Sequence, residues 1–195
     1  MARHLPFLVT VPFVAAAALS LTACSPQLPQ EFYIESRWTP AERQIILDEA
    51  EKWNAVGREY LGLDRILVFR GVYNDRDGFR SEEDLGDDFN VVYVGENNAD
   101  YDLIDTGTEG SYVIGYGTSG DVLLFRFAML NEDGTLNEPL FRQTVLHEFG
   151  HFLGLAHVPD DPKALMYWLT GENSDVITRH DIQAFCLAHD CLKQP

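Results

Sequence analysis

The chain has few basic residues and few cysteines, and each shortage excludes a class of protein. Its 195 residues include 14 Lys and Arg against 31 Asp and Glu, which gives a formal net charge of −17. This acidic excess argues against nucleic-acid binding and against electrostatic attraction to anionic lipid. Only three cysteines are present, so a zinc cluster built from cysteine alone is excluded. The sequence contains no internal repeat and no low-complexity block.

The first 23 residues have the composition of an export signal. Arg3 gives a short basic start, and residues 5–21 form an uncharged apolar run that is short for a membrane span. Leu21-Thr22-Ala23-Cys24 resembles a bacterial lipobox, in which the cysteine becomes the lipidated first residue of the mature protein. We therefore expect a signal peptide over residues 1–23 and an exported cell-envelope protein, held on a membrane surface by lipid at Cys24. The alternative is an ordinary signal peptide, a secreted product and an unmodified Cys24.

The rest of the chain is long enough for one domain with a sizeable core. Residues 25–30 contain two prolines and two glutamines, which is typical of a tether. We assign residues 24–37 to this tether and residues 38–195 to a single folded domain, which we expect to be a monomer.

Apolar spacing predicts a mixture of helices and strands. Thr39, Pro40 and Glu42 predict a helix start, and Gly57 is a suitable stop. Strands are expected over residues 65–73, 91–94, 111–116 and 121–127. Two later helices are expected, one over about residues 138–153 and one that Thr178 begins.

The segment from His147 to His157 reads H-E-x-x-H-x-x-G-x-x-H and is the most informative pattern in the chain. On a helix, His147 and His151 share a face, so both can reach one metal ion. Glu148 lies one step round the helix, close enough to contact a water on that metal without binding the metal. Gly154 lets the chain leave the helix, because glycine adopts positive φ at little cost, and His157 can then fold back as a third ligand. Three protein ligands leave one zinc position open, which is typical of a catalytic site.

This motif resembles the zinc signature of the metzincin metallopeptidases. Residues 164–167 read Ala-Leu-Met-Tyr and are similar to the family's Met-turn, in which a methionine, here Met166, lies under the zinc site. Among the metzincins, this four-residue sequence is most similar to that of the matrixin branch. The resemblance implies an α+β, metzincin-like fold: a twisted five-stranded mixed sheet, an active-site helix, and a small C-terminal subdomain that ends in a helix. It also implies an edge strand that binds substrate by strand addition, and residues 111–116 and 121–127 are the alternatives for it.

The resemblance implies a zinc-dependent endopeptidase that acts on proteins or peptides. Bound zinc lowers the pKa of its water to near neutrality, and Glu148 would take the proton of that water as general base. Tyr167 is a candidate residue of the cleft. The alternative is a non-catalytic surface lipoprotein that binds zinc and holds a peptide or protein partner. The intact Glu148 argues against this alternative, because a binding protein has no need of a base.

Cys186 and Cys191 remain once Cys24 carries lipid, and an exported pair five residues apart favours a disulfide. In a continuous helix their Cα atoms would be too far apart, so a bridge requires the last helix to end or distort near residues 189–190. Two free thiols are the alternative. We expect both His180 and His189 at the surface. Matrixins carry two adjacent acids at the start of the last helix, where this chain has His180-Asp181, so the chain departs from the family pattern there.

Calcium is a second candidate metal, because clustered carboxylates suit it. The acidic loop residues are Asp75, Asp77, Asp87, Asp88, Asp100, Asp102 and Asp105. Residues 73–78 lack the first acid of an EF-hand loop, so a solvated acidic loop is the default. The chain has no histidine between His4 and His147, so we expect no second, structural zinc.

Overall fold

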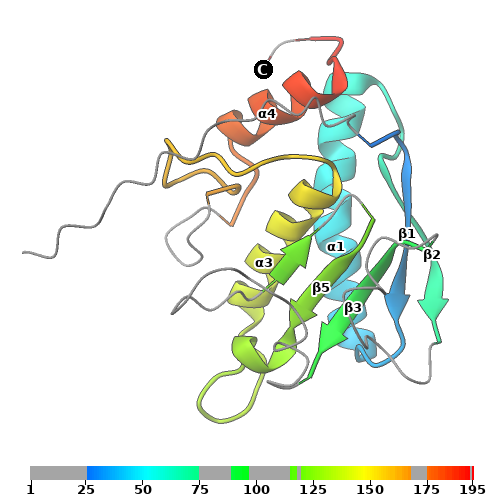
Figure 1. The fold of residues 1–195 in the computed structure, drawn as a ribbon, viewed down its shortest axis with the longest axis vertical. Coiled ribbons are helices and arrows are strands. Elements are labelled where there is room, and N and C mark those ends of the chain that lie inside the picture. Colours follow the sequence, from blue (N-terminus) through cyan, green and yellow to red (C-terminus); the bar gives the residue numbers. More distant parts are fainter. Residues whose placement is uncertain (1–25, 75–88, 97–114, 118–119, 168–174, 194) are drawn as a thin grey trace, which may run out of the picture.

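The computed structural model describes residues 26–74, 89–96, 115–117, 120–167, 175–193 and 195. Helices and a mixed sheet pack together, as Figure 1 shows. The strands are β1 (Gln30–Glu35), β2 (Leu67–Tyr73), β3 (Val91–Gly95), β4 (Gly115–Gly117) and β5 (Val122–Phe125). The helices are α1 (Pro40–Val56), α3 (Glu138–Phe152) and α4 (Arg179–His189), with short helical turns η1 (Gly57–Leu61) and η3 (Arg126–Met129). The α+β fold expected from the sequence is confirmed.

The sheet has the strand order β2-β1-β3-β5-β4. The pairs β1–β2, β1–β3 and β3–β5 are parallel, whereas β4 runs antiparallel to β5. Because β5 is paired on both sides, it cannot be the open edge of the sheet. Of the two segments expected to supply the edge strand, only β4 lies at an edge of the sheet that the described strands form, and it lies against α3.

The two long helices pack on one face of the sheet and enclose the main core. α1 begins at a capping box in which Thr39 and Glu42 exchange hydrogen bonds with each other's backbone, as the sequence predicts. The indole N–H of Trp53 donates to the carbonyl of Leu146 at 2.9 Å and so joins α1 to α3. Phe149, from the middle of α3, is also buried in this core. The rigid packing around α3 fixes the helix that carries the histidine motif.

Strand β1 corrects the boundary that we drew between tether and domain. The assignment of residues 24–37 to a tether is wrong for residues 30–35, which form an interior strand. Phe32 is 1% exposed and Ile34 is completely buried. The sequence pattern conceals this strand because Glu31 and Glu35 flank the apolar residues, and both partner strands come later in the chain.

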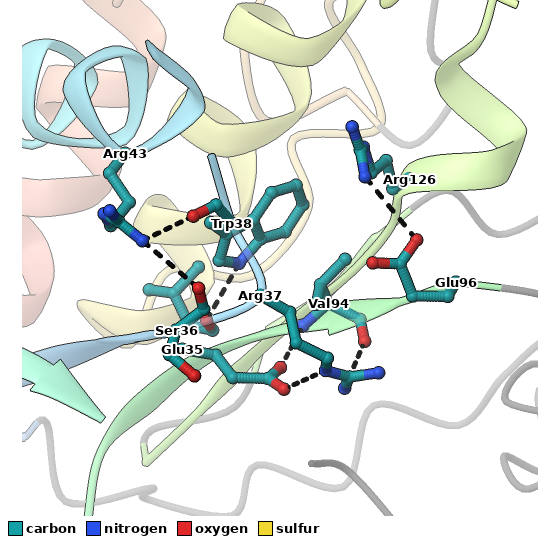
Figure 2. Close-up of polar contacts among 9 residues, drawn as sticks. Glu35, Ser36, Arg37, Trp38, Arg43, Val94, Glu96 and Arg126 are labelled. Carbon is teal, nitrogen blue, oxygen red and sulfur yellow. Dashed lines mark hydrogen bonds and ion pairs between the residues drawn. The ribbon is translucent and has the colours of Figure 1, made fainter. Parts of the chain in front are cut away.

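The charged end of β1 is accommodated by a polar network that Figure 2 shows. Glu35 is buried, accepts from the backbone N–H of Val94 at 2.8 Å, and pairs with Arg37. Arg37 also donates to the carbonyl of Val94 at 2.9 Å, and the indole of Trp38 donates to the carbonyl of Val92 at 3.1 Å. These contacts fix the connection between β1 and α1 against β3, so a buried carboxylate is compatible with an interior strand.

The remaining boundaries differ little from those expected. The strand expected over residues 121–127 ends at Phe125, and the chain continues into η3. Strand β4 overlaps the expected segment 111–116, of which residues 111–114 lie outside the described residues. The signal segment, Cys24 and the seven candidate calcium aspartates also lie outside them. Among the helices that the structure describes, none is long and apolar enough to cross a membrane.

Candidate metal centre

Three histidines come together at the end of α3. His147 and His151 project from one face of the helix, and Gly154, at φ +85°, turns the chain so that His157 returns to them. The Nε2 atom of His151 lies 3.1 Å from Nε2 of His147 and 3.1 Å from Nε2 of His157. The ligand atoms of all three residues lie within 4.8 Å of one another. The structure thus brings together the three residues that the motif singles out.

Backbone carbonyls set the orientation of two of these imidazoles. Nδ1 of His147 donates to the carbonyl of Leu165 at 2.7 Å, and Nδ1 of His151 donates to the carbonyl of Leu155 at 2.8 Å. A carbonyl oxygen can only accept, so the proton of each neutral ring is on Nδ1 and the Nε2 lone pair is free. The hydrogen bond behind each ligand atom fixes the tautomer that metal binding requires.

The spacing of the Nε2 atoms fits a zinc ion. Two unprotonated nitrogens 3.1 Å apart repel each other unless a cation lies between them. A tetrahedral ion with Zn–N bonds of about 2.0–2.1 Å separates its nitrogen ligands by about 3.3 Å. The donor set and its spacing therefore suit zinc, with a fourth position left for another ligand.

Burial keeps the cluster neutral at physiological pH. It lowers the pKa of His147 to about 4 and that of His151 to about 3. The pKa of the more exposed His157 is also lowered, again by burial. Neutral imidazole is the form that binds metal, so the site is prepared for an ion near pH 7.

Glu148 lies between α3 and strand β4. Its side chain is buried at 5% exposure. A Cβ atom added to Gly115 of β4 would lie 2.6 Å from Oε1 of Glu148, so β4 passes directly over the carboxylate. Only glycine leaves room for Glu148 in this position. Sequence reasoning missed Gly115, because nothing in the pattern of residues 111–117 indicates contact with the helix.

Met166 packs against α3 at Gly150, the residue before His151. It is completely buried, and a Cβ atom added to Gly150 would lie 2.3 Å from its sulfur. The carbonyl of Met166 accepts from the backbone N–H of Val158 at 2.8 Å, which ties this turn to the residue that follows His157. Tyr167 follows in the same turn, and its role in the cleft remains a prediction.

Asp181 connects the last helix to this turn. Its buried carboxylate accepts from the backbone N–H groups of Leu165 and Met166, both at 2.9 Å. It also accepts from the backbone N–H of Thr178 at 2.7 Å and from the hydroxyl of Thr178 at 2.6 Å. Because the carbonyl of Leu165 accepts from His147, Asp181 acts on a candidate ligand through one intervening residue.

The other two histidines of the C-terminal part differ in exposure. His180 is exposed, as expected, and pairs with Asp161. His189 is half-buried rather than at the surface: its Nε2 donates to the carbonyl of Leu153 at 2.7 Å, and burial lowers its pKa. The expectation for His189 was wrong, because its acceptor lies 36 residues away in the sequence.

Cys186 and Cys191 form a disulfide, with their Cα atoms 4.8 Å apart. The helix ends at His189, and Asp190 adopts the left-handed conformation at φ 53°. This is the interruption that a bridge over five residues requires.

Residues 28–186 match the sequence model of a peptidase family described as matrixin. A search of curated proteins finds no match to the chain. The solved structures that resemble the chain include archaemetzincin from Methanopyrus kandleri, at 16% identity, with 83% of this chain and 96% of that chain covered and a TM-score of 0.47. They also include myroilysin, at 13% identity, with 86% of this chain and 96% of that chain covered and a TM-score of 0.49.

Proposed function

Because the chain belongs to the matrixin family of zinc-dependent peptidases, we propose that it cleaves internal peptide bonds with Glu148 as general base. The observation that supports this most directly is the convergence of the ligand nitrogens of His147, His151 and His157, together with the burial of Glu148, which directly follows His147. The substrate is a protein or peptide, as for a peptidase in general.

His147, His151 and His157 would hold the ion. Zinc bound by three imidazoles lowers the pKa of water in its open position to near neutrality. Glu148 would accept a proton from the water that attacks the scissile carbonyl and would then donate it to the leaving nitrogen. Its burial between α3 and β4 holds the carboxylate in one place and limits competing bulk water.

Strand β4 would align the substrate. It is an edge strand, and among the described strands its partner is β5 alone. An extended peptide that pairs with β4 would add a strand to the sheet and pass next to Glu148, because Gly115 lies against this carboxylate. The edge strand and the general base would thus act on the same short stretch of substrate.

We also propose that the protein is exported and carries lipid on Cys24. The motif Leu21-Thr22-Ala23-Cys24 supports this, and the Cys186–Cys191 disulfide suits an oxidising compartment outside the cytoplasm. One chain supplies the whole candidate ligand set and the base, so a monomer is sufficient for activity.

The test compares Glu148→Gln with the unsubstituted protein on a library of fluorogenic peptides. We expect the variant to keep one zinc per chain and to lose about 10²–10⁴-fold in kcat/KM, the usual contribution of a general base. Glu138→Gln is the matched control, because Glu138 is exposed on the same helix and pairs with Arg142. Cleavage by Glu148→Gln at the unsubstituted rate would show that another group is the base. An unsubstituted protein that binds zinc and leaves every peptide intact would favour the non-catalytic alternative.

A further inference from the structure

Two leucines near the C-terminus are the most exposed of the large apolar side chains in the described residues. Leu187 is 86% exposed and Leu192 is 80% exposed. The other exposed large apolar residues range from 37% to 56%. Exposed apolar groups of this size, when grouped, indicate a surface that contacts another molecule or a membrane.

The disulfide brings these leucines to the same end of the molecule. Each of them directly follows one of the two bridged cysteines. The backbone N–H of Leu192 donates to the carbonyl of Tyr60 at 2.8 Å, and a Cβ atom added to Gly62 would lie 3.4 Å from its side chain. Leu63, which follows Gly62, is 39% exposed. We call the surface formed by Leu63, Leu187 and Leu192 the leucine end.

The described chain begins at this same end. Pro26 packs against Gly154, whose added Cβ would lie 2.6 Å from Cδ of Pro26. Gly154 follows Leu153, and the carbonyl of Leu153 accepts from His189, which lies between Leu187 and Leu192 in the sequence. Figure 1 shows α4 and the C-terminus at the end of the molecule from which the chain enters β1.

The segment from Cys24 to Pro26 is too short to separate the leucine end from a lipid anchor on Cys24. Cys24 precedes Pro26 by two residues, and two residues span at most about 7 Å even when fully extended. Because β1 and the contact of Pro26 with Gly154 belong to the fold, no long flexible linker remains. A lipid on Cys24 therefore brings the leucine end to the surface of the bilayer.

From these two observations we propose that the leucine end rests on the lipid bilayer and that Leu187 and Leu192 enter its interfacial region. The proposal rests on the lipidation of Cys24 proposed above. The contact is apolar rather than electrostatic: Arg58 and Lys193, two cations near it, are paired with Glu51 at 2.7 Å and with Glu59 at 3.0 Å. The net charge of −17 gives no general attraction to anionic lipid.

The test places tryptophan at the leucine end of the full-length, lipidated protein. Leu187→Trp and Leu192→Trp are each reconstituted into phosphatidylcholine vesicles, either with ordinary or with brominated acyl chains, since bromine quenches nearby indoles. Leu130→Trp is the matched control: Leu130 is 41% exposed, and the segment 130–136 lies at the opposite end of the molecule (Figure 1). Fluorescence is compared with that of the unsubstituted protein, so that its own tryptophans are subtracted.

We expect brominated lipid to quench the tryptophans at positions 187 and 192 and to leave the one at position 130 unchanged. Equal quenching at all three positions, or none at 187 and 192, would overturn the proposal. So would an intact mass that shows no acyl chain on Cys24, or cross-linking of the leucine end to a second copy. Peptide cleavage by each variant in detergent reports separately on the proposed peptidase activity, so the two proposals can fail independently.

Discussion

The two parts of the molecule on either side of Gly154 are held together in different ways. The upper region, residues 26–153, consists of the sheet, α1 and α3, and a large apolar core fixes it. The lower region, residues 154–195, contributes fewer buried apolar side chains among the residues that the structure describes. Asp181, the contact of His189 with Leu153, and the disulfide also hold it.

The residues of the candidate metal centre come from both regions. His147 and His151 belong to a helix of the upper region, so their positions follow from core packing. His157 and Met166 belong to the irregular backbone of the lower region. Met166 packs into the apolar core, and hydrogen bonds join its turn to Asp181 and to Val158, the residue that follows His157. Damage to the lower region should therefore cost metal affinity before it unfolds the sheet.

The largest effect is expected from Asp181→Ala. The substitution leaves four donors on Leu165, Met166 and Thr178 without their acceptor, so we expect the free energy of unfolding to fall by about 4 kcal/mol. Zinc affinity should fall with it, because Leu165 orients His147. Urea unfolding and a competitive zinc chelator measure the two effects. Asp181→Asn, which keeps one acceptor oxygen, should lose less, and an Asp181→Ala variant as stable as the unsubstituted protein would contradict this account of the lower region.

Acid should destabilise the metal-free protein next most strongly. The unfolded chain protonates these imidazoles below about pH 6.5, whereas burial delays protonation of folded His147 to about pH 4 and of folded His151 to about pH 3. Acid therefore favours the unfolded state, and stability is lost as pH falls from about 6.5 towards 4. At pH 5 we expect His147 alone to lower the free energy of unfolding by about 2 kcal/mol.

The measurement is the urea midpoint of chelator-treated protein at pH 7.5 and at pH 5.0. A double variant, His147→Ala with His151→Ala, should show a clearly smaller decrease between the two pH values. Equal decreases in the double variant and the unsubstituted protein would mean that other groups cause the acid sensitivity.

Removal of the disulfide should have a similar or smaller effect. Closing so short a loop stabilises a protein by about 2 kcal/mol through the entropy of the unfolded chain, so Cys186→Ser with Cys191→Ser should lose about that amount. The loss should be confined to the lower region: hydrogen exchange should increase in α4 and stay unchanged in α1 and α3. Uniform acceleration of exchange across the sheet would show that the two regions unfold as one unit.

The smallest effect is expected in the upper region, from Gly115→Ala. The new methyl group would overlap Glu148, and overpacking of this kind costs about 1 kcal/mol or more. Because the overlap would disturb the position of the carboxylate, we expect kcat to fall by about tenfold. Zinc content should not change, because no ligand is touched. Gly134→Ala separates general strain from contact with the carboxylate: its Cβ meets no atom within 4 Å, but Gly134 has φ +79°, so this variant should lose stability and keep its kcat. Equal kcat values for Gly115→Ala and the unsubstituted protein would mean that β4 does not constrain the carboxylate.

Features with a local sequence signature could be predicted. The resemblance to matrixins is confirmed by the family match over residues 28–186, and the start of α1 is confirmed at its capping box. The histidine motif depends on helical spacing and on one turn. The sequence alone was therefore sufficient to predict that His147, His151 and His157 lie together.

Features that depend on contacts between distant segments could not be predicted. Strand β1 has charged ends, and it is recognisable only through its pairing with β2 and β3 and the burial of Glu35 against Val94. The contact of Gly115 with Glu148 could be predicted only by knowing that β4 passes over this side chain of α3. The carbonyl of Leu153, which accepts a hydrogen bond from His189, lies at the end of a different helix. In each case the partner is far away in sequence, and no local pattern of residue types reports it.

The central claim is that one zinc ion, held by histidines from both regions, is necessary and sufficient for peptide cleavage by this chain. Titration of metal-free protein with zinc, with cleavage of a fluorogenic peptide as readout, tests this claim most directly. We predict that activity rises linearly to one equivalent of zinc and then stays constant. Cleavage by the metal-free protein, or no cleavage once one equivalent is bound, would contradict it.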